Sequence, residues 1–300
     1  MDGCERRICM EAGMKKKRIC RILSGVFAAA FAAALWTAET EKRAHYVPDY
    51  DKVNLEDVLE QEKLSGEDYE MIFRQTGLAP AGVDQLYAEG RQDILPDLQE
   101  HFFKEVKVKC RHTLFLVRSE QVDGAEALQT DFFPTLEEGD ILVSFSSHIL
   151  GWRSGHAGIL VDREEELVLE AVCLGRDSAL CSLEDWKKDP CIAVLRLRGV
   201  SLEERAEIAD YAREHLAGLP YRLDSFAVRG NRDISESGLS GTQCAHLIWW
   251  VYYQFGYDLD RGGDWIVTPG DLYRSELLEP VQVYGMEPGY GRGGPGSPID

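Results

Sequence analysis

The stretch GHAGILVDREEELVLEAV, residues 155–172, has two apolar runs on either side of the polar pentapeptide DREEE. Short runs rich in Val, Ile and Leu and bounded by glycine or polar residues are typical of β-strands. A polar link of about five residues between two such runs favours a hairpin. The stretch therefore predicts a pair of neighbouring antiparallel strands.

The register of this predicted hairpin brings a histidine next to a carboxylate. With Val161 opposite Leu167, Gly158 pairs with Glu170, and His156 and Glu170 share one face of the sheet on a diagonal. Diagonal neighbours lie roughly 7–8 Å apart, within reach of long side chains. Because a shift of one residue would reverse the faces, the juxtaposition depends on this register.

Glu170 is the unusual residue of the hairpin, because it interrupts an apolar run from Leu167 to Val172. A carboxylate inside a strand that is apolar on both faces needs a hydrogen-bonded or charged partner. His156 is the nearest predicted partner, and Asp162 at the turn is the second choice of carboxylate for that histidine. An ordinary buried His–Glu bond is the alternative to a catalytic pair.

Cys244 lies in a second informative stretch, LSGTQCAHLIWWVYYQFG, residues 239–256. The Ser-Gly-Thr triplet before it is typical of a helix N-terminus, so we expect a helix that begins near the cysteine. His246 is predicted at the surface or in a supporting position. Apolar residues follow the cysteine at helical spacing and favour a buried, inert thiol, namely Leu247, Ile248, Val251 and Phe255.

The same position also suits a nucleophile. Unpaired N–H groups and the helix dipole stabilise a thiolate at the first turn of a helix. An imidazole beside a thiol accepts its proton. From the helix alone, the inert cysteine is the better interpretation; the predicted His156–Glu170 pair makes the nucleophile an equal alternative.

The rest of the chain divides into a helical part and a strand-rich part. Runs such as VKVKCRHTLFLV, GDILVSF and CIAVLRLR predict strands, and residues 201–218 predict an amphipathic helix. This pattern predicts an α+β fold on an antiparallel sheet with packed helices. We assign a signal peptide or N-terminal anchor to 1–38, an extended linker to 39–54, a small helical module to 55–105, the main domain to 106–285 and a disordered tail to 286–300.

Within the helical module, two local patterns mark helix ends. Ser65 and Asp68 have the spacing of a capping box at a helix N-terminus. Gly77 and Gly90 are placed where a glycine stops a helix. The module offers no residues that indicate chemistry.

The N-terminal segment has the layout of a secretory signal peptide. Four basic residues at 15–18 precede an apolar, alanine-rich stretch and then small residues, with cleavage expected up to Ala38. The apolar stretch is short for a transmembrane helix, which needs about 20 residues, so an uncleaved anchor is the alternative. We expect a secreted or extracytoplasmic protein that meets a membrane only through this segment.

The composition excludes one class of partner. Lys and Arg number 33 against 52 Asp and Glu, whereas a nucleic-acid-binding protein needs a basic surface. The cysteines lack zinc-site spacing, and no glycine-rich phosphate loop occurs, so we expect neither a metal nor an organic cofactor. Cleavage at Ala38 would leave five cysteines, which keeps open a structural disulfide through Cys244.

Five stretches together resemble a known family: GDILVSFSS, GHAGILVD, LVLEAV, GTQCAHLIWWVYYQFG and TPGDLYRS. Their order over residues 135–280 is similar to that of the circularly permuted branch of the NlpC-type papain-like cysteine hydrolases, the YiiX/YebB-like group. The resemblance implies a papain-like fold with Cys244 as nucleophile, His156 as base and Glu170 as the third polar residue. It also implies an oxyanion site, for which Tyr221 and the backbone N–H of the cysteine are the candidates.

This resemblance implies an exported cysteine peptidase or amidase that cleaves amide bonds through a thiol acyl-enzyme, in the peptides of peptidoglycan. Two alternatives stay open. Similar proteins act on lipid acyl groups, and a hydrolase or acyltransferase of that kind would need an apolar groove, for which the candidates are Ile149, Leu150, Trp152 and Trp249. The other alternative is a catalytically inactive papain-like domain that binds envelope ligands.

Overall fold

The computed structural model describes the chain over residues 21–32, 45–114, 117–123, 132–149, 152–223, 239–260 and 266–288. A largely exposed helix occupies residues 21–32, inside the predicted signal peptide, and the remainder of that peptide lies outside the described residues. No helix within these stretches is long and apolar enough to span a membrane. The predicted tail from residue 289 onward also lies outside the described residues.

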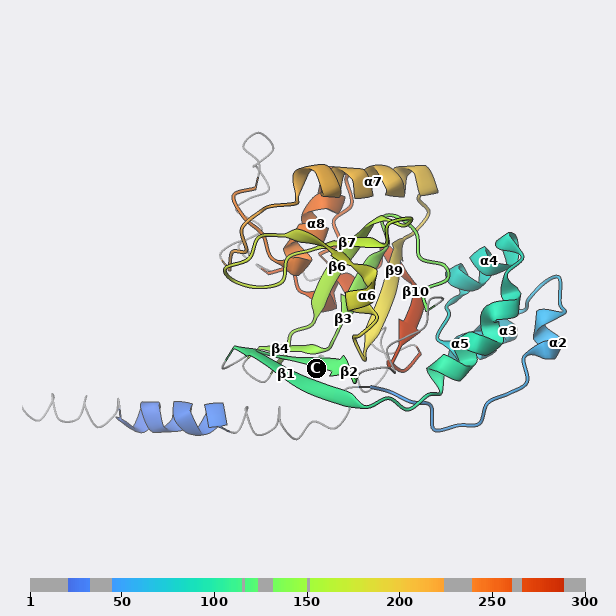
Figure 1. Cartoon of the computed structure of the whole chain (residues 1–300), viewed down its shortest axis with the longest axis horizontal. Coiled ribbons are helices and arrows are strands. Elements are labelled where there is room, and N and C mark those ends of the chain that lie inside the picture. Colours follow the sequence, from blue (N-terminus) through green and yellow to red (C-terminus); the bar gives the residue numbers. More distant parts are fainter. Residues whose placement is uncertain are drawn as a thin grey trace, which may run out of the picture.

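In the part of the chain that the structure describes, the strands form two antiparallel sheets, which confirms the predicted α+β class (Figure 1). The larger sheet has six strands in the order β10-β9-β3-β6-β7-β8, with bounds β3 (Ile141–Ser144), β6 (His156–Asp162), β7 (Leu167–Glu170), β8 (Ala179–Ser182), β9 (Ile192–Leu197) and β10 (Leu278–Tyr284). The smaller sheet has the order β1-β2-β4-β5, with bounds β1 (Val108–Leu114), β2 (Val117–Val122), β4 (Ser147–Ile149) and β5 (Trp152–Arg153). The predicted hairpin corresponds to β6 and β7.

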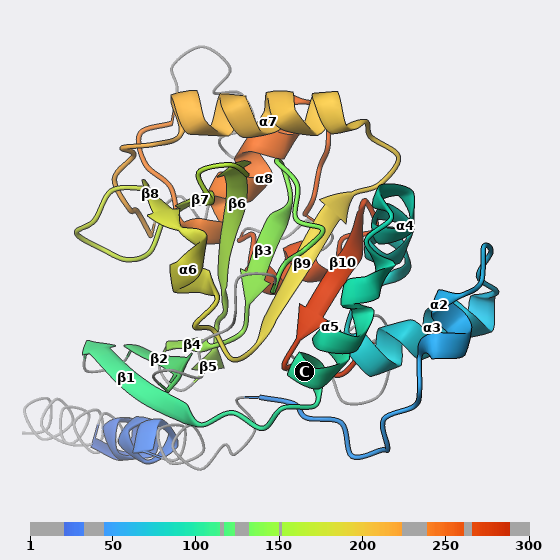
Figure 2. The ribbon, with the colours of Figure 1, turned by 45° about the vertical axis from the view of Figure 1, so that its right-hand side comes forward.

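Different helices cover the two faces of the larger sheet, with α8 behind the strands and α6 in front of them in Figure 2. Ala157 and Ile159 belong to the apolar cluster that contains α7 and α8, and Leu160 belongs to the cluster that contains α6. Because strand residues alternate between faces, His156 and Gly158 lie on the α6 side. The helices are α6 (Leu183–Trp186), α7 (Leu202–His215), α8 (Cys244–Gln254) and α9 (Pro269–Arg274).

Helix α8 lies in the interior of the protein. Every residue from Cys244 to Tyr252 is buried, and a helix that is apolar on all sides is typical of a core position. The predicted surface position of His246 is therefore wrong, because the residue is fully buried in the core around this helix.

The predicted helical module contains α2 (Glu56–Leu59), α3 (Gly66–Thr76), α4 (Pro80–Glu89), the 3-10 helix η1 (Gln92–Ile94) and α5 (Leu95–Phe102). Its capping box is confirmed: the Ser65 hydroxyl accepts from the N–H of Asp68, and the Asp68 carboxylate accepts from the N–H of Ser65 at 2.8 Å. Gly77 and Gly90 end α3 and α4 in the left-handed conformation, as predicted. The helices enclose an apolar cluster of their own.

The turn between α3 and α4 covers the outer edge of β10. The N–H of Ala79 donates to the carbonyl of Val281 at 2.9 Å, and the N–H of Val283 donates to the carbonyl of Gly77 at 2.8 Å. A Cβ atom on Gly77 would lie 2.1 Å from the Val283 oxygen, so only glycine allows this approach. Since an open strand edge invites aggregation, the module protects this end of the sheet.

The described part of the predicted linker, residues 45–54, contacts both the larger sheet and the helical module. The N–H of Tyr46 donates to the carbonyl of Gly285 at 2.9 Å, beyond the end of β10. The amide of Gln99 in α5 donates to the carbonyl of Val53 at 2.9 Å. This segment therefore joins the helical module to the sheet.

A buried ion pair ties the start of β3 to β9. The guanidinium of Arg196 donates to the two carboxylate oxygens of Asp140 at 2.8 and 2.7 Å, and the Asp140 residue is 0% exposed. The same guanidinium donates to the Thr135 carbonyl at 2.7 Å and to the Gln85 side chain of α4 at 2.9 Å. The pair thus links the sheet to the helical module.

We expect Asp140→Ala to lower the free energy of unfolding by about 3–5 kcal/mol, because it leaves a buried guanidinium without its bidentate partner. Urea denaturation measures the loss. The control is Lys52→Ala, which removes the exposed Lys52–Glu100 pair (2.6 Å) and should cost at most about 1 kcal/mol. Equal losses in the two variants would show that the buried pair does not stabilise the fold.

Candidate active site

His156 and Glu170 are in direct contact at one end of the hairpin. Nε2 of His156 lies 2.8 Å from Oε2 of Glu170. Gly158 pairs with Glu170, which confirms the predicted register at this end. Both side chains are partly buried, so the carboxylate inside the apolar strand has the partner that its position requires.

The register differs from the prediction next to the turn. A β-bulge shifts the pairing, so that Asp162 and not Val161 lies opposite Leu167. The carboxylate of Asp162 accepts from Arg213 at 2.8 Å. Asp162, the second choice of orienting carboxylate, therefore lies in an ion pair at the opposite end of β6 from His156.

Two glycines and a tryptophan shape the surroundings of His156. Gly155 has a φ of 72°, and a Cβ atom on it would lie 2.8 Å from the carbonyl oxygen of Ser144. A Cβ atom on Gly158 would lie 2.7 Å from the ring of Trp186. The Trp186 ring stacks on the His156 ring with centroids 5.1 Å apart and an interplanar angle of 15°. The indole therefore restricts the imidazole from one side.

Cys244 is the first residue of α8, where the sequence predicts the helix to begin. Its sulfur interacts with His156, whose pKa it raises, and lies 3.3 Å from Oε1 of Gln243, the N-cap residue. The residue is 9% exposed, at the boundary of the core. The structure thus brings Cys244, His156 and Glu170, the three predicted catalytic residues, into one chain of contacts.

The charges of the pair stabilise each other. Burial alone would lower the pKa of His156, but its hydrogen bonds to Cys244 and Glu170 and the charge of Glu170 raise that pKa well above its usual value. Burial alone would raise the pKa of Glu170, but its hydrogen bond to His156 and the charge of the imidazolium hold it below the usual value. The Cys181 thiol on β8 donates a further hydrogen bond to the Glu170 carboxylate.

A ladder of three short segments positions the start of α8. The N–H of Ser178 donates to the carbonyl of Leu219 at 2.7 Å. The N–H of Thr242 donates to the carbonyl of Pro220 at 3.0 Å, and the N–H of Arg222 donates to the carbonyl of Thr242 at 2.8 Å. Glu170 is the last residue of β7. These bonds connect the loop that follows β7 with the turn before Cys244.

Tyr221 lies in the middle segment of this ladder and forms a parallel bridge with Thr242. Burial raises the pKa of Tyr221, and negative charge on Cys244 raises it further. The predicted oxyanion residue is therefore next to the predicted nucleophile, and its role stays a prediction.

Sequence reasoning missed a second acidic group beside His156. Asp189, in the turn after α6, is hydrogen-bonded with the hydroxyls of Ser144 and Ser146 and interacts electrostatically with His156. Burial raises the pKa of Asp189 to about 7 against the opposing effect of these partners. The signal available in the sequence was weak, because Ser144 and Ser146 are ordinary residues at the end of a strand and Asp189 is 33 positions from the histidine.

The residues predicted for a lipid groove do not form one in the described part of the chain. Trp249 is fully buried within α8, and its indole N–H donates to Asp258 at 2.9 Å. Ile149 is exposed at the end of β4. Leu150 and the side chain of Trp152 lie outside the described residues.

The described residues show neither a disulfide through Cys244 nor a group of metal ligands. The thiol of Cys244 is free, so the predicted alternative of a structural disulfide through this cysteine is not found among the residues that the structure describes. Among the residues that the structure describes, no group of three or more His, Cys, Asp or Glu side chains is arranged to hold a metal ion.

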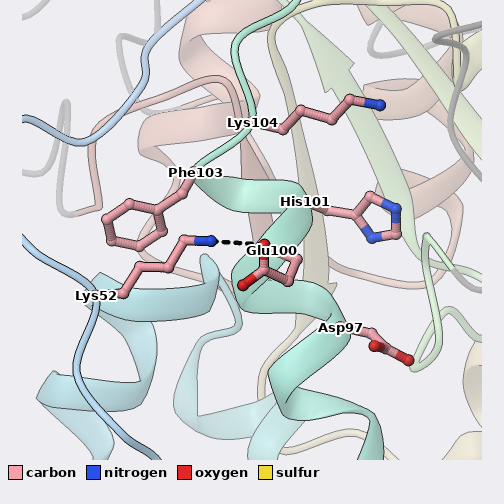
Figure 3. A pocket seen from close by; sticks show the side chains of 6 residues that line it. All are labelled: Lys52, Asp97, Glu100, His101, Phe103 and Lys104. Carbon is pink, nitrogen blue, oxygen red and sulfur yellow. Dashed lines mark ion pairs between the residues drawn. The ribbon is translucent and has the colours of Figure 1, made fainter.

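A cavity of about 400 Å³ opens beside α5 and is separate from this site (Figure 3). Its lining contains none of the catalytic candidates; the residues are Lys52, Asp97, Glu100, His101, Phe103 and Lys104. Lys52 and Glu100 form an ion pair of 2.6 Å within it.

No protein-family model and no curated protein matches the chain. Among solved structures, the chain is similar to YiiX from Escherichia coli, which is described as a metalloprotein, with 19% sequence identity and a TM-score of 0.36. The similarity covers 48% of this chain and 96% of the YiiX chain. Similarity at this level leaves the activity to be argued from the residues of the site.

We expect Glu170→Gln to lower the titration midpoint of His156, because the variant removes the carboxylate charge that favours the imidazolium. Nuclear magnetic resonance of the histidine ring protons measures the midpoint, with His156→Ala used to assign the signal. A raised pKa stabilises the fold below the usual histidine value, and this stability is lost as the pH rises through the raised value. The stability advantage of the wild type over the variant should therefore shrink at alkaline pH. An unchanged His156 midpoint would contradict this account.

We expect Gly241→Ala to open the ladder, because a Cβ atom there would lie 2.2 Å from Arg222 and 2.7 Å from the Pro220 oxygen. The start of α8 should move, and the rate of Cys244 alkylation should fall at least about tenfold. Gly66→Ala is the matched control, since nothing lies within 4 Å of the added atom. Equal rates in the two variants would mean that the ladder does not position the thiol.

Proposed function

We propose that this protein is a cysteine hydrolase in which Cys244 is the nucleophile, His156 the general base and Glu170 the residue that orients the histidine. The observation that carries the proposal is the chain of contacts from the Cys244 thiol through His156 to Glu170. A thiol beside a histidine whose other nitrogen is held by a third group is suited to acyl transfer. The resemblance of the motifs to the permuted NlpC-type papain-like hydrolases supports the same assignment.

The reaction follows from these contacts. Because Nε2 of His156 is held by Glu170, Nδ1 receives the proton of the Cys244 thiol. The sulfur attacks the carbonyl carbon, a C–S bond forms, and the carbonyl oxygen becomes an oxyanion. As the C–N bond breaks, the imidazolium returns the proton to the leaving amine. Water, deprotonated by His156, then attacks the thioester and releases the acid and the thiol.

Two further groups would act on the charges that develop. Glu170 stabilises the imidazolium through its hydrogen bond and its negative charge. The oxyanion would form near the first turn of α8, where the candidate donors are the backbone N–H of Cys244 and the side chain of Tyr221, whose segment pairs with Thr242. Donors placed at this point are typically worth several kcal/mol in acyl transfer, about 3–4 per donor.

The proposed substrate is a peptide amide of peptidoglycan. It rests on the family resemblance and on the signal-peptide layout of residues 1–38, which would place the enzyme outside the cytoplasm. An exported amidase would have access to the peptides of the cell wall. The acyl transfer described above requires no cofactor.

A second candidate substrate is a lipid acyl ester or amide. Three exposed apolar side chains lie on the two segments that meet at the ladder beside Cys244: Val172 (49%), Leu174 (56%) and Leu223 (48%). Apolar side chains next to a nucleophile favour an acyl chain over a charged peptide. The two candidates share the nucleophile and differ in the group that it attacks.

We expect iodoacetamide at pH 7 to label Cys244 faster than the other cysteines, because His156 accepts the thiol proton. His156→Ala should slow this labelling about tenfold or more, and His215→Ala, which removes an exposed histidine on α7, should leave it unchanged. Peptide mapping by mass spectrometry identifies the labelled residue. Slow labelling of Cys244, or equal labelling in His156→Ala, would refute the nucleophile.

Turnover then separates the substrates. The wild type should release free amines from peptidoglycan fragments, and a p-nitrophenyl ester of a fatty acid tests the lipid alternative. His156→Ala should reduce turnover about 100-fold or more, and Cys244→Ser should abolish it. A reactive thiol with no turnover of either substrate would favour the inactive, ligand-binding alternative.

A further inference from the structure

The indole of Trp186 lies against the histidine in a buried, closely packed position. The centroids of the Trp186 and His156 rings are 5.1 Å apart with an interplanar angle of 15°, and Trp186 is 2% exposed. A Cβ atom on Gly158 would lie 2.7 Å from Cζ2 of the indole and 2.7 Å from a methyl group of Val168. The glycine therefore allows the indole to approach β6 closely.

Helix α6, which carries Trp186, is tied to the turn of the hairpin that carries the histidine. A helix of four residues is too short to be stable on its own. The N–H of Leu183 donates to the carbonyl of Glu166 at 2.8 Å. The ammonium of Lys187, which is 2% exposed, lies 2.5 Å from the Glu184 carboxylate and 3.6 Å from that of Glu166. These contacts fix the indole relative to β6 and β7.

The hydrogen bond to Glu170 does not by itself fix the plane of the imidazole. It holds the His156 ring at one atom, Nε2, at 2.8 Å. Rotation of a histidine ring about its Cβ–Cγ bond has broad minima. Because Nε2 lies nearer to that axis than Nδ1 does, a rotation that strains the bond to Glu170 only slightly moves Nδ1 further. The atom that serves the thiol thus needs a second restraint.

Stacking on the indole supplies this restraint. A rotation about the Cβ–Cγ bond would drive one edge of the His156 ring into the face of Trp186, which the packing around Gly158 and α6 holds in place. An imidazolium is also attracted to the indole as a cation within about 6 Å of an aromatic face. The stack therefore restrains the ring with and without its second proton.

We propose that Trp186 is a positioning residue that fixes the plane of His156 and thereby keeps Nδ1 directed at the Cys244 sulfur. The inference rests on the proposed function, because it concerns the base of the same reaction. It divides the control of the histidine between two groups: Glu170 holds one nitrogen, and the indole holds the plane of the ring.

Substitutions that keep or remove the flat ring test the proposal through kcat. Trp186→Leu keeps an apolar side chain without a ring face, so kcat should fall about tenfold or more while KM changes little. Trp186→Phe keeps an aromatic face and should retain most of the wild-type kcat. The matched control is Phe132→Leu, which removes a buried ring from the same apolar cluster, where it contacts Phe133 and Tyr284. This control should lose stability but keep the wild-type kcat.

The mobility of the His156 ring gives a second readout that needs no substrate. Nuclear magnetic resonance relaxation of the ring carbons, assigned with His156→Ala, should show a more mobile ring in Trp186→Leu than in the wild type, Trp186→Phe or Phe132→Leu. Thermal unfolding of each variant reports the loss of stability separately. A loss of packing alone would lower the unfolding temperature without this selective gain in ring mobility.

The pattern across the variants decides the outcome. A wild-type kcat in Trp186→Leu, or equal losses in Trp186→Leu and Trp186→Phe, would overturn the role of the indole; turnover that still requires His156 would leave the proposed function standing. If the wild type turns over neither substrate, the proposed function fails, and an equally ordered His156 ring in Trp186→Leu overturns this inference independently. Should Trp186→Leu fail to fold, Trp186→Met, which fills more of the space with a flexible side chain, is judged by the same results.

Discussion

The hydrogen bond between His156 and Glu170 is the constraint on which the site depends. Glu170 lies in a strand that is otherwise apolar, and burying its charge requires a partner. The register of β6 and β7 supplies that partner, and Gly158 makes room for the tryptophan that stacks on the histidine. The imidazole then has a fixed plane and one occupied nitrogen. Its second nitrogen is available to a thiol.

Two features outside the hairpin position the thiol: the packing of helix α8 in the core and the contacts of its first turn. Helix α8 is buried on all sides, so its axis is fixed by the core. Its first turn is fixed by the ladder that includes Thr242 and by the amide of Gln243. A nucleophile at the end of a rigid, buried helix loses little freedom when it meets its base, which is the condition for efficient acyl transfer.

Part of this arrangement could be predicted from local sequence. Strand alternation and a polar turn were enough for the hairpin and for the Gly158–Glu170 pairing, and the Ser-Gly-Thr triplet indicated where α8 begins. The bulge at Asp162 could not be predicted, because it depends on the turn geometry. The burial of His246 could not be predicted, because a period of 3.6 does not distinguish a half-buried helix from a fully buried one. The ladder and Asp189 arise from contacts between distant segments and leave no pattern in the sequence.

The most direct test of the account is capture of the acyl-enzyme. The wild type is mixed with a turned-over amide or ester, quenched in acid within the first turnover, and examined by intact mass and by peptide mapping. The account predicts an added acyl mass on Cys244 that disappears on further incubation and does not form in His156→Ala. Turnover that persists in Cys244→Ser, or an acyl group on any other residue, would contradict it.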